Sequence, residues 1–185
     1  MKKCILFFTF LPLFVFGQKK TDAYIEKWKD ECVLQMKEHG IPASITMAQA
    51  ILESGNGASV LATKANNHFG IKCGAYWTGE TILQDDDKKG ECFRVYPDAK
   101  SSFEDHSVFL KKERYASLFE LSPTDYKGWA YGLKKCGYAT NPQYPQKLIE
   151  LIEQYHLDEL DKNVEIVSVE TKKKIAELPL LETAE

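Results

Sequence analysis

The stretch Ala50-Ile-Leu-Glu-Ser-Gly-Asn-Gly57 places one carboxylate at the end of an otherwise apolar helix. Apolar residues recur at helical spacing up to this point, at Ile45, Ala48, Ile51 and Leu52. Gly55 is a typical helix stop, so we expect Glu53 in the last turn of a helix whose neighbours are buried. Desolvation and the negative end of the helix dipole both disfavour the anion and so raise the pKa of this carboxyl group. A raised pKa suits a general acid near neutral pH, although a partly exposed glutamate at a helix end would leave the same pattern.

The first 17 residues have the composition of a secretory signal peptide. Basic residues 2–3 precede an apolar run over residues 5–16, which is followed by a small residue. We therefore expect cleavage between Gly17 and Gln18 and export to the periplasm or the extracellular space. The apolar run is too short for a stable membrane span, so no membrane anchor is expected.

The composition indicates one acidic domain. The chain has 185 residues with 24 basic and 27 acidic side chains, so loss of Lys2 and Lys3 leaves 22 basic side chains and a net charge of about −5. That balance does not favour nucleic-acid binding. Residues 18–160 are long enough for one domain with a sizeable core, which we expect to be monomeric. Residues 161–185 lack aromatic residues and periodicity, which is typical of a flexible charged tail.

The hydrophobic pattern predicts a mostly helical α+β protein with one small β-hairpin. Helices are expected over residues 25–40, 42–53, 59–65, 125–136 and 144–155, with one more after Pro97. The period changes between residues 71 and 95, where residues 81–84 and 92–96 are typical of two strands. Ser101 and Ser102, each three residues before an acid, offer capping boxes for the helix after Pro97.

Four cysteines follow the signal segment, at Cys32, Cys73, Cys92 and Cys136. Export permits disulfides, and Cys73 and Cys92 flank the predicted hairpin, so they are the best candidate pair. Cys32 and Cys136 fall on predicted helices and are either a second bridge or buried thiols. No two cysteines have the short spacing of structural zinc sites, so we expect no metal and no cofactor.

The predicted hairpin turn carries three consecutive acids, Asp85-Asp86-Asp87. Most acid runs are solvated loops. Glycoside hydrolysis, however, usually takes a protonated carboxylic acid on the leaving oxygen and a second carboxylate across the sugar. Glu53 fits the first role and one of the three aspartates fits the second, with the hairpin forming one wall of a cleft.

Aromatic side chains also gather in the predicted loops and helix ends. They are Tyr76, Trp77, Tyr115, Trp129, Tyr138 and Tyr144. Flat rings suit the apolar faces of sugars, and their polar atoms suit the hydroxyl groups. Ordinary core packing is the alternative for Trp129, where we favour it, and for Tyr115. Tyr138 follows a helix stop at Gly137, so we expect it to face the cleft.

Four segments resemble the glucosaminidase family, glycoside hydrolase family 73, of the lysozyme-like superfamily. The segment Ala43-Ser-Ile-Thr-Met-Ala-Gln-Ala-Ile-Leu-Glu-Ser-Gly-Asn-Gly57 looks like its catalytic helix. The other three are Asn66-Asn-His-Phe-Gly-Ile-Lys72, Phe93-Arg-Val-Tyr96 and Gly137-Tyr-Ala-Thr-Asn-Pro-Gln-Tyr144. Together they span about residues 23–160 in the family's order, which makes the signal far more specific than any one motif.

The resemblance implies a lysozyme-like fold and endo-β-N-acetylglucosaminidase activity on peptidoglycan glycan strands, at the β-1,4 bond between N-acetylglucosamine and N-acetylmuramic acid. It assigns the general acid to Glu53 and an active-site tyrosine to Tyr138. The expected substrate-binding residues, taken from the motifs, the hairpin and the aromatic set, are Asn67, His68, Phe69, Gly70, Trp77, Asp86, Tyr115 and Tyr144.

The hairpin departs from the family pattern. Many members carry a Thr-x-Glu whose glutamate has been taken as the second carboxylate, and this chain has no such motif. It offers the three aspartates and Glu91 instead, and we favour Asp87 by position. An aspartate that activates water, one that stabilises an oxocarbenium ion, and help from the substrate acetamido group all stay open.

Three other functions compete with a glucosaminidase. A lytic transglycosylase needs one glutamate and no second carboxylate, so the altered hairpin is compatible with it. A catalytically impaired wall-binding module is also compatible, although pure binding makes no demand for a buried acid. A cysteine amidase built on Cys73 and His68 is the weakest, because a disulfide-bonded thiol is no nucleophile.

Overall fold

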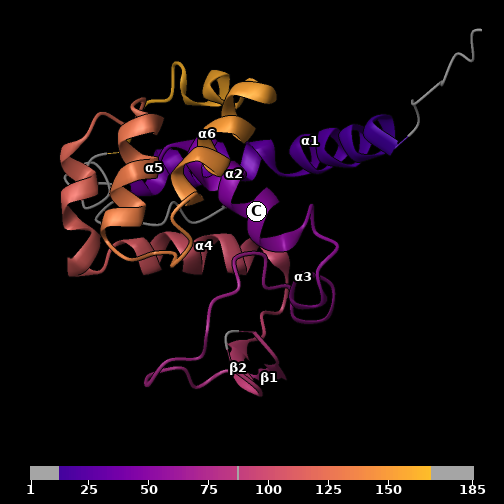
Figure 1. Cartoon of the computed structure of the whole chain (residues 1–185). Helices are drawn as coiled ribbons and strands as arrows, with labels where there is room; N and C mark the ends of the chain where they lie inside the picture. Colours follow the sequence, from indigo (N-terminus) through magenta and orange to yellow (C-terminus); the bar gives the residue numbers. More distant parts are fainter. Residues whose placement is uncertain (1–12, 87, 168–185) are drawn as a thin grey trace, which may run out of the picture.

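The computed structural model of the protein describes residues 13–86 and 88–167, with only the backbone for residues 13–17. Its elements in chain order are α1 (Leu13–His39), α2 (Ala43–Ser54), α3 (Val60–Ala65), β1 (Thr81–Gln84), β2 (Glu91–Arg94), α4 (Ala99–Leu110), the 3-10 helix η1 (Glu113–Glu120), α5 (Tyr126–Lys135), α6 (Tyr144–Gln154) and the 3-10 helix η2 (Leu157–Asp161). Figure 1 shows a helical body with the two strands set apart below α4. The predicted α+β, mostly helical fold with one small hairpin is confirmed.

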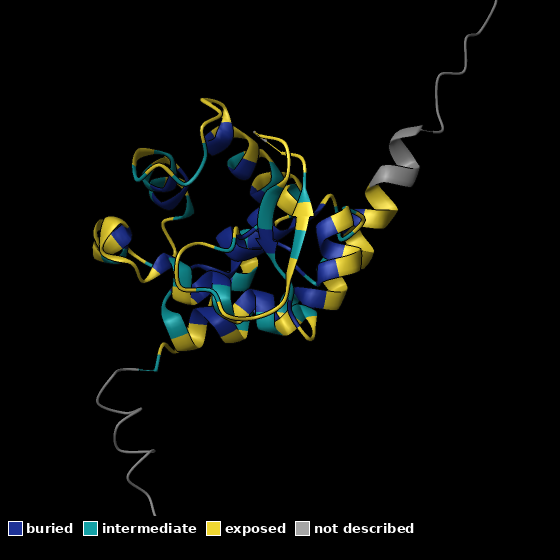
Figure 2. Cartoon of the chain, turned by 90° about the horizontal axis from the view of Figure 1, so that it is seen from below, coloured by how far each residue is buried: buried dark blue, intermediate teal, exposed yellow. Residues whose placement is uncertain are grey.

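Helix α2 lies in the middle of the helical body and packs on α1, α6 and η2. Ten of its twelve residues are buried, which is the behaviour of a helix that is apolar on all sides. Its buried polar side chains at Ser44, Gln49 and Ser54 each have a hydrogen-bond partner. Figure 2 shows how buried and exposed residues are distributed over the body, with buried residues in dark blue on the inner faces of the helices and exposed residues in yellow on the outside.

The N-terminus of α2 is capped by a side chain that comes late in the sequence. Pro42, predicted to be the first helical residue, is the N-cap and offers no side-chain acceptor. Asp161 of η2 supplies one instead, because its Oδ1 accepts from the Ser44 backbone N–H at 2.8 Å and its Oδ2 from the Ser44 hydroxyl at 2.6 Å. Burial nonetheless raises the pKa of Asp161 to about 6, more than these bonds lower it.

The packed domain extends beyond the predicted boundary at residue 160. Asp161 is 3% exposed, and the Val167 N–H donates to the Lys37 carbonyl of α1 at 2.9 Å. The predicted tail over residues 161–185 is therefore wrong for its first residues, because η2 supplies the α2 cap. Residues 168–185 lie outside the described part of the chain.

Helix α1 packs on the body through the face that carries Trp28, Cys32 and Met36, which are buried. Its backbone begins at Leu13, so it includes the expected signal-peptide cleavage point, while residues 1–12 of the predicted signal peptide lie outside the described residues. None of the helices in the described ranges is both long and apolar enough to cross a membrane.

The hairpin is a two-stranded antiparallel sheet that is fixed to the body at its base. Thr81 pairs with Arg94 and Gln84 with Glu91, so β2 ends two residues earlier than predicted. The predicted disulfide between Cys73 and Cys92 is present, and it joins the segment before the hairpin to β2. Among the described residues, the other two cysteines, Cys32 and Cys136, are free thiols.

The start of α4 and the segment after it differ from the sequence prediction. The capping boxes at Ser101 and Ser102 are wrong, because Asp98 is the N-cap and its side chain accepts from the Ser101 N–H at 2.8 Å. The 3-10 helix η1 was not predicted from the sequence.

Candidate active site

A cavity of about 660 Å³ opens where the end of α2, the base of the hairpin, the end of α4 and the start of α6 meet. Its size is within the usual range for ligand sites, about 300–1,000 Å³. Each of the four segments that resemble the glucosaminidase family contributes residues to its wall. The lining residues are Leu52, Glu53, Phe69, Gly70, Ile71, Lys72, Gly74, Asp86, Arg94, Phe109, Lys112, Tyr138, Ala139, Thr140, Asn141, Tyr144 and Lys147.

Glu53 stands in the last turn of α2 as predicted, and its carboxylate is held from the side by α6. Gly55 caps the helix with a φ of 57°, in the left-handed region that favours glycine. The Tyr144 hydroxyl donates to Glu53 Oε1 at 3.1 Å and accepts from Gln49 Nε2 at 2.9 Å. Since Gln49 lies one turn before Glu53, the tyrosine joins two side chains of the same helix face. This chain of donors orients Oε1 as an acceptor and leaves Oε2 for the proton of the neutral acid.

The pKa of Glu53 is raised above its ordinary value. Burial of the carboxylate against the cavity wall is the main cause, the hydrogen bond from Tyr144 opposes it, and the negative charge of Asp86 adds to it. The residue as a whole is exposed because it opens to the cavity, but its carboxyl end has protein around it. A carboxyl group of this kind keeps its proton to a higher pH than a free glutamate, which general-acid catalysis requires.

Tyr138 lies beside this carboxylate and is fixed by aromatic neighbours. It follows Gly137, whose φ of 74° ends α5, and its ring stacks on Tyr144 with centroids 5.7 Å apart. The edges of His106 and Phe109 also pack against the ring. Burial raises the pKa of Tyr138 well above its ordinary value, and the charge of Glu53 adds to that. The hydroxyl is therefore neutral at physiological pH.

The acidic hairpin turn contributes one described carboxylate to the cavity. Asp86 lines it and forms an ion pair with Lys72 Nζ at 3.4 Å. Asp85 is used within the turn, where it accepts from the Gly90 N–H at 2.8 Å, and Glu91 pairs with Lys72 at 2.8 Å. Asp87, the residue favoured from the sequence, lies outside the described residues.

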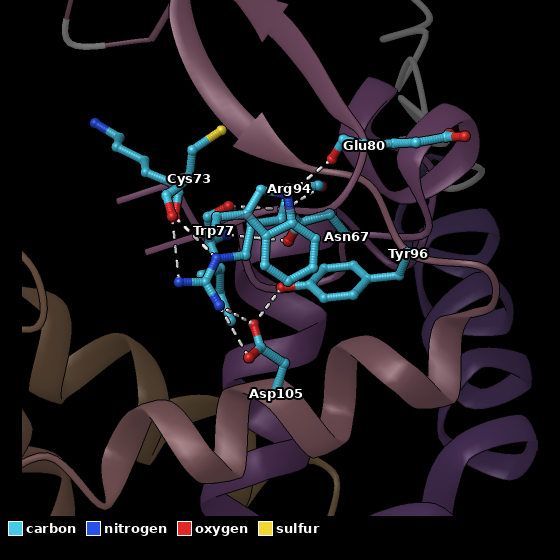
Figure 3. Close-up of polar contacts among 9 residues, drawn as sticks. Asn67, Cys73, Trp77, Glu80, Arg94, Tyr96 and Asp105 are labelled. Atoms are coloured by element: carbon cyan, nitrogen blue, oxygen red, sulfur yellow. Dashed lines mark hydrogen bonds and ion pairs between the residues drawn. The ribbon is translucent and has the colours of Figure 1, made fainter. Parts of the chain in front are cut away.

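Arg94 ties the hairpin to α4, as Figure 3 shows. Its Nη1 donates to both oxygens of Asp105, at 2.9 and 2.7 Å, and its Nε donates to the Lys72 carbonyl at 3.2 Å. The Tyr96 hydroxyl donates to the same carboxylate at 2.5 Å. Trp77 covers the guanidinium, 4.7 Å from its ring centroid. The indole predicted to bind substrate thus packs on the hairpin anchor and lines a neighbouring groove instead of this cavity.

Three other predicted binding residues lie away from the cavity. The Asn67 amide bonds the Ile71 backbone and the Arg94 carbonyl, so it closes the loop onto the hairpin. His68 bonds the Tyr24 hydroxyl at 2.6 Å and faces a different cavity beside α1. Tyr115 is fully buried and packs behind Tyr138, which is the core alternative considered for it. Phe69 and Gly70, in contrast, line the cavity together with Glu53, Tyr138 and Tyr144. Asp86 is the sixth described residue that was predicted for the site and lines the cavity.

Sequence reasoning missed several side chains that build the site. Arg94 stood in a quoted motif, but its partner Asp105 carries no local signal because the two meet only in the fold. Gln49 lies among apolar residues of α2. A polar side chain in such a segment indicates a buried hydrogen-bond partner, which here is the Tyr144 hydroxyl. Lys112 and Lys147 belong to no quoted motif, yet both line the cavity.

Within the described ranges, one group of side chains has the spacing of metal ligands, and it is elsewhere. Glu38, His39 and Glu104 bring their ligand atoms within 4.8 Å of one another. His39 Nε2 and Glu104 Oε2 already pair at 3.0 Å. The group therefore has a structural explanation, and the chemistry around Glu53 involves none of its members.

Comparisons with known proteins agree on one family. The model of the glucosaminidase family, described as mannosyl-glycoprotein endo-beta-N-acetylglucosaminidase, matches residues 29–157. The exo-glucosaminidase LytG of Bacillus subtilis is 38% identical over 156 residues, which cover 77% of this chain and 54% of that protein. The peptidoglycan hydrolase FlgJ of Pseudomonas aeruginosa is 32% identical over 128 residues, 62% of this chain and 32% of that one. The chain thus spans about half the length, or less, of these relatives.

Solved structures give the same result for the fold. A peptidoglycan hydrolase from Sphingomonas sp. A1 superposes with a TM-score of 0.65 at 30% identity, over 75% of this chain and 91% of that one. The catalytic domain of the autolysin Auto from Listeria monocytogenes also gives 0.65, at 28% identity, over 83% of this chain and 91% of that one.

Proposed function

Because the chain belongs to the glucosaminidase family of glycoside hydrolases, we propose that it hydrolyses peptidoglycan glycan strands in the cavity around Glu53. The bond we assign is the β-1,4 linkage between N-acetylglucosamine and N-acetylmuramic acid. The observation that carries the proposal is a carboxyl group of raised pKa that is held by Tyr144 in a cavity lined by all four family motifs.

Glu53 acts as the general acid. With Oε1 accepting from Tyr144, the proton on Oε2 is available to the glycosidic oxygen as the bond to the leaving sugar breaks. The same hydrogen bond stabilises the carboxylate that remains after proton transfer, since a bond to a charged acceptor is stronger than one to a neutral acceptor. Burial thus favours the acid before the step, and the bond from Tyr144 limits how far the pKa is raised, so that the proton can still leave.

Asp86 is the described residue best placed to act as the second carboxylate. It lines the same cavity, its charge acts on Glu53, and it forms an ion pair with Lys72. Asp87 stays the alternative taken from the sequence. Both assignments are tested by comparing Asp86→Asn and Asp87→Asn with Asp85→Asn, whose side chain serves the turn. If Asp86→Asn hydrolyses peptidoglycan as fast as Asp85→Asn, Asp86 is not the second carboxylate.

Tyr138 and Tyr144 position the sugar. Their stacked rings stand next to the acid, and Phe69 and Gly70 form the wall beside them. An aromatic pair offers a flat apolar surface to a sugar ring, while the neutral hydroxyl of Tyr138 is left to bond the substrate. Asn67, His68, Trp77 and Tyr115, also expected from the sequence to bind substrate, are proposed to support the loops and the core around the site.

We also propose that the protein is exported, as the first 17 residues predict. The disulfide between Cys73 and Cys92 supports this, because such bonds persist in oxidising compartments. Peptidoglycan itself lies outside the cytoplasm. Fractionation of cells that produce the full chain tests the proposal: a shortened protein outside the cytoplasm agrees with it, and a full-length cytoplasmic protein contradicts it.

The experiment that tests the bond assignment is mass spectrometry of borohydride-reduced products from purified peptidoglycan. Reduced N-acetylglucosamine ends are expected. Reduced muramic ends would move the cut to the other linkage, and 1,6-anhydro-muramic ends would make the protein a lytic transglycosylase. Binding without any soluble product would favour a wall-binding module.

A further inference from the structure

Among the described residues that line the cavity around Glu53, positive side chains outnumber negative ones. Its described acids are Glu53 and Asp86, and its bases are Lys72, Arg94, Lys112 and Lys147. Two of the bases are neutralised by neighbours: Lys72 pairs with Asp86 and Glu91, and Arg94 pairs with Asp105. For the other two, the described residues provide no carboxylate within 4.0 Å.

Lys112 is the better placed of these two cations, because further positive charge surrounds it. Its Nζ lies 4.1 Å from the centre of the Phe109 ring, which also lines the cavity, and the Arg114 guanidinium lies 5.7 Å from the same ring. Arg114 bonds the Tyr115 hydroxyl and the Gly137 carbonyl, both uncharged groups. This end of the cavity therefore has unbalanced positive charge.

The electrostatics of Lys112 agree with that geometry. Its pKa is lowered, first by desolvation and then by the charges of Arg94 and Arg114, while Asp105 acts in the opposite direction. The charge that acts on Glu53 is that of Asp86. An anion bound at Lys112 would therefore gain attraction from Lys112 and Arg114, whose charges no carboxylate of the described residues pairs within 4.0 Å.

We propose that Lys112, backed by Arg114, is a specificity-determining residue that binds a carboxylate carried by the muramic-acid residue of the substrate. This inference rests on the proposed function. N-acetylglucosamine is uncharged, whereas muramic acid carries a lactyl group that is either a free carboxylate or joined to a peptide with carboxylates of its own. The shared chemistry is a carboxylate on the lactyl side of the sugar, and a flexible lysine at a cavity edge suits such a group.

The test is calorimetric binding in a Glu53→Gln background, which prevents turnover. Three ligands separate the sources of charge: neutral chitotetraose, a peptide-free tetrasaccharide of alternating N-acetylglucosamine and N-acetylmuramic acid, and the same tetrasaccharide with its peptides. Lys112→Ala is compared with Lys112→Arg, which keeps the charge. Lys135→Ala is the matched control, an exposed lysine of α5 that does not line the cavity.

We expect Lys112→Ala to weaken binding of a muramic-acid ligand about fivefold, with chitotetraose unchanged, Lys112→Arg close to the parent, and Lys135→Ala without effect. Added salt should weaken the muramic-acid ligands more than chitotetraose. An effect already present on the peptide-free ligand identifies the lactyl carboxylate, and an effect confined to the peptide-bearing ligand identifies the peptide. Equal weakening of all three ligands, or of none, overturns the proposal.

Hydrolysis by the wild-type protein separates this inference from the function on which it rests. If peptidoglycan is cleaved but Lys112→Ala does not discriminate between the ligands, the carboxylate contact is wrong and the proposed function stands. If nothing is cleaved but the discrimination is observed, the contact stands and the hydrolase proposal falls.

Discussion

Replacing Arg94 with methionine should loosen the hairpin from the body. Methionine keeps much of the length of arginine but removes the fork that bonds Asp105 at 2.9 and 2.7 Å and the Lys72 carbonyl at 3.2 Å. Asp105 would then keep only the Tyr96 hydroxyl among these donors. The loss matters for the proposed function because Lys72 and Asp86, which line the cavity around Glu53, lie on the segments that Arg94 holds.

The magnitude follows from the burial of the pair. The two side chains are only 15% and 22% exposed, so water replaces the lost bonds poorly. Breaking a buried pair by removing one partner costs about 3–5 kcal/mol, and we take the lower limit because this pair is partly hydrated, about 3 kcal/mol. For a domain of this size each kcal/mol lowers Tm by about 2–4 °C, so the expected loss is about 6–12 °C.

A double-mutant cycle isolates the interaction. Thermal unfolding is followed for Arg94→Met, Asp105→Asn and the double variant, with peptidoglycan hydrolysis measured on each. Asp105→Asn removes the carboxylate charge that Arg94→Met leaves without its partner. The loss of unfolding free energy in the double variant should therefore be about 1–2 kcal/mol smaller than the sum of the losses in the two single variants. Arg94→Lys should fall between wild type and Arg94→Met, since an ammonium group cannot reproduce the fork. A Tm for Arg94→Met within about 2 °C of wild type, or additive losses in the cycle, would refute this reasoning.

Three further predictions concern the groups that surround or support Glu53. Tyr144→Phe removes the bond that lowers the pKa of Glu53, and Asp86→Asn removes the charge that raises it. The alkaline limb of kcat/KM should therefore move to higher pH in the first variant and to lower pH in the second, and movement in the same direction would be inconsistent with Glu53 as the acid. Cys73→Ser with Cys92→Ser opens a loop of sequence separation 19 and should cost about 3 kcal/mol in thermal unfolding; an unchanged Tm would mean that the hairpin base needs no cross-link. The pKa of Asp161 is raised to about 6 from 3.8, so its contribution to stability is complete below pH 3.8 and lost as pH rises through 6. Asp161→Asn should lose that pH dependence between about pH 3.8 and 6, and an unaltered dependence would assign it to another group.

The sequence predicted the elements whose signals are local. Glu53 was placed in the last turn of its helix because the apolar spacing and Gly55 lie within one short segment. The strand at Thr81–Gln84, the pairing of Cys73 with Cys92, and Tyr138 after the stop at Gly137 were predicted for the same reason. Each of these depends on residues that are close in the chain.

The errors at the domain boundary and around the cavity concern interactions between distant segments. The cap of α2 comes from Asp161, 117 residues after Ser44, so nothing near Pro42 indicates it, and the domain boundary was placed too early. Trp77 lies in a loop segment with an aromatic neighbour, which is typical of sugar-binding loops. Its ring nevertheless covers Arg94, a contact that forms only when the hairpin packs on α4. Tyr115 follows basic residues at a helix end but is fully buried. Whether an aromatic side chain faces a ligand or the core is decided by tertiary packing, which local patterns do not contain.

The most direct test of the central claim is the rate of peptidoglycan hydrolysis by Glu53→Gln, measured beside Glu104→Gln, an exposed glutamate that does not line the cavity. Glutamine keeps the shape and the acceptor for Tyr144, but its amide has no acidic proton to transfer to the glycosidic oxygen. We expect kcat to fall about 10²- to 10⁴-fold in Glu53→Gln with little change in Tm, and the control variant to keep its rate. A folded Glu53→Gln protein that releases products at the wild-type rate would contradict the assignment of Glu53 as the general acid.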